Sequence, residues 1–338
     1  MQKLAIPLAI VTVLSFMICS NQVLAHTFSE NENALFLTMI NKLKAETQLV
    51  AHDYSNNTKQ AQDHVNAALT LFTQKDPVVN TTWTSEISER NPRVTTDLLH
   101  SLNDLKTSLA SNSNPSSVQS KVTNIGNLLD EAVSVRISKD LMNNPKIQAL
   151  VLANLGNEIY SNYGSALGLP SNTIANMAGM SMSSEGVSMN MNTNSGNGMS
   201  GMNAMTEHNT MNQSPVTIKN LTAYQTAQSL AAVAQQVFDN NLKPIAPTNA
   251  TNSNSNIANY LNQLKDAVNN KASLMNIMEL VHVKLHPMLI GAYNLQLSMP
   301  GMSMPSKGAS MNMNSNSGNG MSGMNMPSNG FSMNMNKQ

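Results

Sequence analysis

Methionine side chains recur in closely spaced pairs within two segments of the chain. Of the 26 methionines, nine lie in residues 177–211 and ten in residues 299–335. Neither segment has a hydrophobic stripe that these side chains could join. A thioether is a soft, neutral donor that suits Cu(I). The Met-x-Met and Met-x-x-Met pairs therefore predict copper sites, with the candidate ligands Met180, Met182, Met189, Met191, Met199, Met202, Met302, Met304, Met311, Met313, Met321 and Met324.

The two methionine-rich segments are copies of one sequence. Residues 179–203 align without gaps to residues 301–325, and the two differ at four of the 25 positions. Every methionine of the first copy recurs in the second, which indicates a repeated module. A low-complexity spacer, in which methionine is incidental or acts as a reversible sink for oxidants, is the alternative interpretation. The abundance of Gly, Ser, Asn and Met predicts that both segments are disordered.

A second candidate metal site lies on a predicted helix at Glu279, His282 and His286. Steps of three and four residues place one carboxylate and two imidazoles on a single helix face. The Glu-x-x-His part resembles one ligand pair of ferritin-like di-iron bundles, but the first half of the chain lacks a matching pair, so di-iron chemistry is not predicted. Pro287 places His286 near a kink. The alternative is a polar, solvated helix face without a ligand.

The remaining histidines give weaker predictions. His26 would become the mature N-terminus after cleavage of a leader, and its amine and imidazole could begin a copper-binding histidine brace. In an antiparallel hairpin of the first two helices, His64 falls opposite Glu46, which predicts at best a weak surface site. A second ligand for the brace would have to come from His52, His64 or His100.

Helical periodicity dominates the rest of the chain. Apolar residues at steps of three and four predict five helices between residues 26 and 170, and Asn-Pro pairs at residues 91–92 and 144–145 mark two helix starts. Further helices are predicted over 217–241, 256–270 and 272–297. No segment shows the alternation of a strand. The fold class predicted is all-α, with up-and-down helical bundle units.

Composition divides the chain into five segments. Residues 1–25 have the basic start, apolar stretch and small-residue exit of a signal peptide, so a secreted protein is expected. A helical bundle (26–170), a methionine-rich linker (171–215), a second, shorter helical unit (216–298) and a methionine-rich tail (299–338) follow. The apolar stretch of the leader is short for a membrane span. No span is predicted in the mature chain.

Composition also excludes several function classes. Cys19, the only cysteine, lies in the predicted leader, so the mature chain has no disulfide, thiol catalysis or cysteine-based metal site. A formal charge of zero with 11% charged residues gives no basis for binding nucleic acid. The sequence contains no recognisable catalytic motif. An enzyme built on His26, or on Glu279, His282 and His286, is therefore the third hypothesis, after the two that follow.

Two resemblances bear on function. Residues 130–136 and 282–297 resemble uncharacterised, Asn-rich, secreted helical proteins of ammonia-oxidising archaea, and the methionine pairs resemble motifs of periplasmic copper-resistance and copper-transport proteins. The second resemblance implies a protein that captures, transfers or stores Cu(I), with metal ions and cell-envelope proteins as partners. The competing hypothesis is a cell-surface glycoprotein without a metal role, because five glycosylation sequons occur, at Asn56, Asn80, Asn212, Asn220 and Asn249.

Overall fold

The computed structural model describes residues 30–76, 80–180 and 216–295. These residues fold mainly into helices, and they contain no β-strand. The all-α fold class predicted from the apolar periodicity is therefore confirmed.

Asparagine residues start most of the helices in the first part of the chain. The side chain of Asn57 accepts a hydrogen bond from the backbone N–H of Gln60, and Asn91, Asn114 and Asn144 cap their helices in the same way, each followed directly by proline. Both starts predicted from Asn-Pro pairs are thus confirmed. The helices are α1 (Glu30–Tyr54), α2 (Thr58–Thr73), α3 (Trp83–Ser88), α4 (Pro92–Ala110), α5 (Pro115–Arg136), α6 (Lys139–Met142) and α7 (Pro145–Ala166).

Two helices in the second part of the chain are interrupted by wide π-helical turns. The bounds are α8 (Ser171–Met180), α9 (Leu221–Val237), a π segment (Phe238–Leu242), α10 (Thr251–Asn269), α11 (Leu274–Met278), a π segment η5 (Glu279–Leu285) and α12 (His286–Tyr293). Each π segment ends shortly before a proline, Pro244 or Pro287. A proline has no N–H to donate, and its ring crowds the carbonyl four residues earlier, so the preceding turn widens. The irregularity predicted at Pro287 is present.

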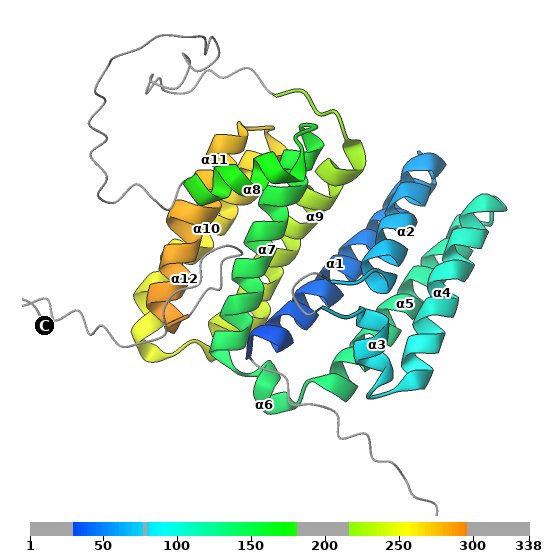
Figure 1. The fold of residues 1–338 in the computed structure, drawn as a ribbon, viewed down its shortest axis with the longest axis horizontal. Coiled ribbons are helices and arrows are strands. Elements are labelled where there is room, and N and C mark those ends of the chain that lie inside the picture. The colour runs from blue at the N-terminus through cyan, green and yellow to red at the C-terminus, as the bar shows by residue number, and fades with distance from the viewer. Residues whose placement is uncertain (1–29, 77–79, 181–215, 296–338) are drawn as a thin grey trace, which may run out of the picture. The chain divides into compact units, whose positions relative to one another are not determined.

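Helices α1 and α7 form the centre of the helical body (Figure 1). Helix α1 packs against α2 and α5 and also against α7 and α9, while α7 packs against α1, α9, η5 and α12. Both helices bury residues on more than one face, including Phe36, Leu43, Leu152 and Tyr163. Burial of apolar surface on several sides makes these two helices the core that positions all the others.

The helices before and after residues 181–215 share one hydrophobic core. The chain divides into the units Met1–Leu297 and Ser298–Gln338, and every described residue belongs to the first. The segment boundaries at residues 170, 215 and 298 stay predictions about the sequence, whereas the packing of α9 on α1 and α7 joins the two helical regions physically.

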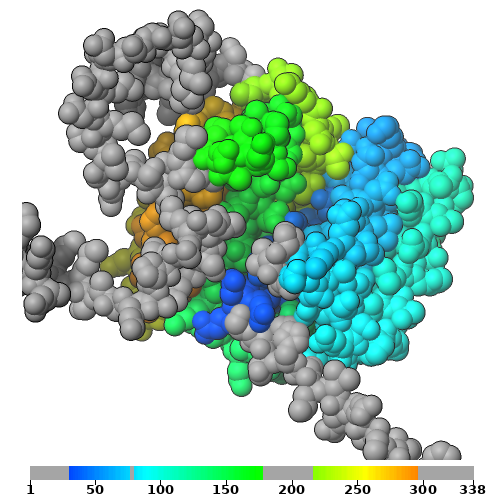
Figure 2. Space-filling view, viewed as in Figure 1, coloured from blue at the N-terminus to red at the C-terminus, as the bar shows by residue number. Residues whose placement is uncertain are grey.

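Helical structure extends beyond the predicted end of the first bundle, because α8 continues to Met180. This helix crosses α7 (Figure 1), and it forms part of the surface seen in Figure 2. Ile174 is buried against Gly164 of α7, where a Cβ would approach the Ile174 side chain to 2.7 Å. Tyr160 also donates a hydrogen bond to the carbonyl of Ile174. The burial of one side chain against one glycine is a local contact, and it leaves no periodic pattern of apolar residues in the sequence.

Candidate functional site

Two histidines of the predicted metal site lie together inside the helical body. His282 belongs to the π segment η5 and His286 begins α12, and their side chains face α7. The two ring centroids are 5.0 Å apart, and the planes meet edge to face. His282 also meets the ring of Tyr160 edge to face at 5.1 Å. Only 7% of His282 and 1% of His286 is exposed, so the imidazoles form a buried pair.

Each imidazole of this pair has one nitrogen without a hydrogen-bond partner. Nε2 of His286 lies 3.0 Å from the carbonyl oxygen of Ala153 and donates to it, which leaves Nδ1 as the unpaired nitrogen. Nε2 of His282 is also buried without a partner. Buried polar atoms are nearly always hydrogen-bonded, so these two unpaired nitrogens are unusual.

The surroundings keep both rings neutral. Burial lowers the pKa of His286 to about 4, and burial together with the neighbouring His286 lowers the pKa of His282 to about 4. Gly156 of α7 makes the close approach possible, since a Cβ there would lie 3.3 Å from Nε2 of His286 and 3.2 Å from Cγ1 of Val281. Neutral imidazole is the form that can bind a metal.

Glu279 does not join the two histidines, so the prediction of one shared helix face is wrong. Its side chain is 51% exposed and forms an ion pair with Lys284, 3.1 Å away and five residues later. A pairing five residues apart is the spacing of a π-helical turn, whereas the prediction assumed α-helical steps of three and four. Among the described residues, no group of three or more His, Cys, Asp or Glu side chains is arranged to hold a metal.

The predicted methionine ligands lie outside the part of the chain that can be described. Met180 is the last residue of α8. The other eleven paired methionines and His26 fall in residues 1–29, 181–215 and 296–338. The copper sites predicted for them therefore stay predictions.

A second cluster of polar groups is buried where α1, α2 and α9 meet. Nδ1 of His64 lies 2.7 Å from Oε2 of Glu46, and both side chains are almost fully buried. The other carboxylate oxygen of Glu46 accepts a hydrogen bond from the hydroxyl of Thr226, at 2.8 Å. The sequence predicted the pairing of Glu46 with His64, but as a surface site. The cluster is buried because α9 covers it, and α9 follows about 160 residues later in the chain.

Gln225 of α9 connects this ion pair to a second carboxylate. Its side-chain oxygen accepts from Nε2 of His64 at 3.2 Å, and its amide donates to Oδ1 of Asp53 at 3.1 Å. Oδ2 of Asp53 lies 3.6 Å from His64. Burial alone would lower the pKa of His64, but the hydrogen bond and charge of Glu46, with help from Gln225 and Asp53, raise it above the ordinary value. The raised pKa favours the imidazolium form of His64, which can donate from both nitrogens.

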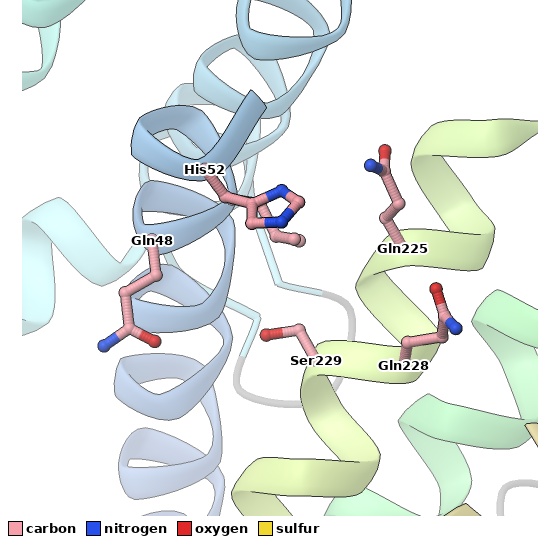
Figure 3. Close-up of a pocket in the computed structure, with 6 residues that line it drawn as sticks. Gln48, His52, Gln225, Gln228 and Ser229 are labelled. Atoms are coloured by element: carbon pink, nitrogen blue, oxygen red, sulfur yellow. The ribbon is translucent and has the colours of Figure 1, made fainter. Parts of the chain in front are cut away.

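A shallow pocket opens beside this cluster, between α1 and α9 (Figure 3). Its volume is about 380 Å³, and it is lined by Gln48, Leu49, His52, Gln225, Gln228 and Ser229. Nδ1 of His52 lies 2.8 Å from Oδ1 of Asp53, while most of its ring is exposed. The carboxylate can therefore orient His52 as a base or ligand at the pocket. His100 is exposed on α4, 3.3 Å from Asp104, and joins neither cluster.

Comparisons with known proteins assign no family to the chain. No protein-family model matches it, and neither a curated protein nor a solved structure does. Among the described helices, none has both the length and the apolar character needed to cross a membrane.

Proposed function

We propose that this chain is a secreted copper-handling protein whose methionine modules capture Cu(I) and pass it on or store it. The observation that supports the proposal is the repeated module, in which every methionine of residues 179–203 recurs in residues 301–325. Paired thioethers can converge on a soft ion without losing a proton. Several weak sites on one chain raise the local concentration of ligand without trapping the metal.

The helical body supplies the attachment points for the modules. Residue 180, where α8 ends, continues into the first module, and α12 ends shortly before the second. Both of these helices pack on α7. The proposal therefore assigns a scaffold role to the helices and metal capture to the two modules.

A titration of the full chain with Cu(I) against a competing chelator tests this function. The informative variant replaces the twelve paired methionines with leucine, which keeps the apolar character and removes the sulfur. The matched control replaces Met275 and Met288 of the helical body instead. The module variant is expected to lose most of its Cu(I) stoichiometry and the control none. Equal copper binding by the module variant and the unmodified chain would refute the proposal.

A cell-surface glycoprotein without a metal role is the second candidate. The observation that favours it is the exposure of the sequon asparagines Asn56, Asn80, Asn220 and Asn249. Carbohydrate attachment requires such accessible side chains. Mass spectrometry of the protein from its natural source, before and after removal of N-glycans, tests this role. Glycosylation together with module-independent copper binding would favour the glycoprotein over the copper-handling protein.

A further inference from the structure

The pocket between α1 and α9 offers a hydrogen-bond acceptor whose orientation is fixed from behind. Nδ1 of His52 lies 2.8 Å from Oδ1 of Asp53, and an ionised carboxylate can only accept, so Nδ1 carries the proton of the neutral ring. Nε2 of His52 then keeps its lone pair, on a side chain that is mostly exposed and lines the pocket. Figure 3 shows this ring between the two helices.

Gln228 supplies a second acceptor from the α9 side of the same pocket. Its amide nitrogen donates to the hydroxyl of Tyr224 at 3.3 Å and to Oδ1 of Asn269 at 3.0 Å. Both N–H groups of the amide are thereby used, and Oε1 remains as its acceptor for a ligand. Gln48 and Ser229, which also line the pocket, can either donate or accept. The two lining groups that are held in place therefore favour a ligand with N–H or O–H donors.

Negative charge lies directly behind these acceptors. Asp53 contacts two lining residues, His52 and Gln225, and its Oδ2 is buried without a hydrogen-bond partner. Glu46 is the second buried carboxylate, and His64 is the only basic group that contacts the two in the described part of the chain. With both carboxylates ionised and His64 protonated, one negative charge is left over. The six lining residues include no Lys or Arg, so the potential at the pocket favours a cation.

We infer that this pocket binds a small organic cation with several N–H donors, such as a protonated primary amine. An ammonium group carries three donors and no acceptor, which matches acceptors set in front of an excess carboxylate. The pocket volume of about 380 Å³ is within the range of small-molecule sites. A bare metal ion fits less well, because the described residues contain no group of three or more His, Cys, Asp or Glu side chains that could hold one. The inference is independent of the methionine modules and gives the helical body a ligand of its own.

Three probes with the same four-carbon chain separate charge from hydrogen bonding. The full chain, with a copper chelator present, is titrated with 1,4-diaminobutane, 1,4-butanediol or succinate, and the ring signals of His52 and His100 are followed by NMR. Diaminobutane is expected to shift the His52 signal in a saturable way and to leave the His100 signal unchanged. The diol should bind about tenfold more weakly, because its hydrogen bonds are not charge-assisted. Succinate should not bind.

Two variants, studied by calorimetry, locate the binding at the pocket. His52→Phe keeps an aromatic ring and removes Nε2, whereas Ser229→Lys adds a positive charge at the pocket wall. The matched control is His100→Phe, at an exposed ring of α4 that lies 3.3 Å from Asp104. Both pocket variants should bind diaminobutane at least about tenfold more weakly than the unmodified chain, and the control equally well.

Circular dichroism establishes that each variant is folded before binding is compared. If His52→Phe does not fold, Ser229→Lys and the three probes still decide the question. The inference is overturned if the unmodified chain shows no saturable binding of diaminobutane, if it binds the diol or succinate as tightly, or if the folded Ser229→Lys variant binds diaminobutane undiminished.

Discussion

Acidification should destabilise the metal-free protein through the buried histidine pair. The pKa of His282 and of His286 is lowered from 6.5 to about 4 in the folded state by burial. Well above pH 6.5 both rings are neutral in the folded and unfolded chains, so they contribute no pH dependence there. As the pH falls from 6.5 towards 4, the unfolded chain binds protons that the folded chain cannot accept. The free energy of unfolding therefore decreases in this window.

The size of the effect follows from the two pKa values. At pH 5 each histidine lies 1.5 pH units below its unfolded pKa of 6.5 and still above its folded pKa. One unit corresponds to about 1.36 kcal/mol, so each ring lowers the free energy of unfolding by about 2 kcal/mol relative to pH 7, and the pair by about 4 kcal/mol. Such a loss is a large part of the stability of a typical domain.

Urea unfolding followed by circular dichroism at pH 7 and pH 5, with a copper chelator present, measures this loss. The unmodified chain is compared with the double variant His282→Gln/His286→Gln and with the control His100→Gln. Apart from His100 in the control, the other titratable groups are common to the three proteins, so their contributions cancel in the comparison. The double variant should lose about 4 kcal/mol less than the other two proteins between pH 7 and pH 5. An equal loss in all three would refute the reasoning.

Two further predictions concern buried contacts. Glu46→Gln should lower the free energy of unfolding by about 3 kcal/mol at pH 6, because it leaves the buried imidazolium of His64 without its partner. The raised pKa of His64 stabilises the fold below pH 6.5, and this contribution is lost as the pH rises through the folded pKa. The cost of Glu46→Gln, measured by urea unfolding, should therefore be smaller at pH 8 than at pH 6. An equal cost at both pH values would contradict this prediction. Gly156→Ala should destabilise by about 1–3 kcal/mol, since the added Cβ crowds His286. Gly126→Ala is the matched control, because open space surrounds Gly126 within α5 and the change should raise the thermal midpoint. Similar shifts of the midpoint for both alanine variants would argue against the packing at Gly156.

Sequence reasoning succeeded where local rules decide the structure. The Asn-Pro starts at residues 91–92 and 144–145 depend on capping and on the chemistry of proline, which act within one helical turn. The pairing of Glu46 with His64 was predictable because it follows from the length of one short hairpin.

It failed where the helical period changes. The prediction for Glu279, His282 and His286 assumed α-helical geometry, but the turn before Pro287 is π-helical and directs Glu279 to solvent. A proline signals such a kink, but the surrounding packing decides how the turn adjusts. The depth of the histidine pair likewise depends on α7, whose Gly156 and Ala153 lie about 130 residues earlier in the chain.

The sequence by itself determined that the described chain is helical, that two of its helices begin at Asn-Pro pairs, and that two methionine modules are copies of each other. Only the tertiary structure decided which polar residues are buried together. His64, Glu46 and Asp53 become a closed polar cluster because α9 covers them, and His282 and His286 become a buried pair because they pack on α7. Burial sets the charge state and the free donors of these side chains, and burial arises from contacts between distant segments, which helical periodicity does not encode.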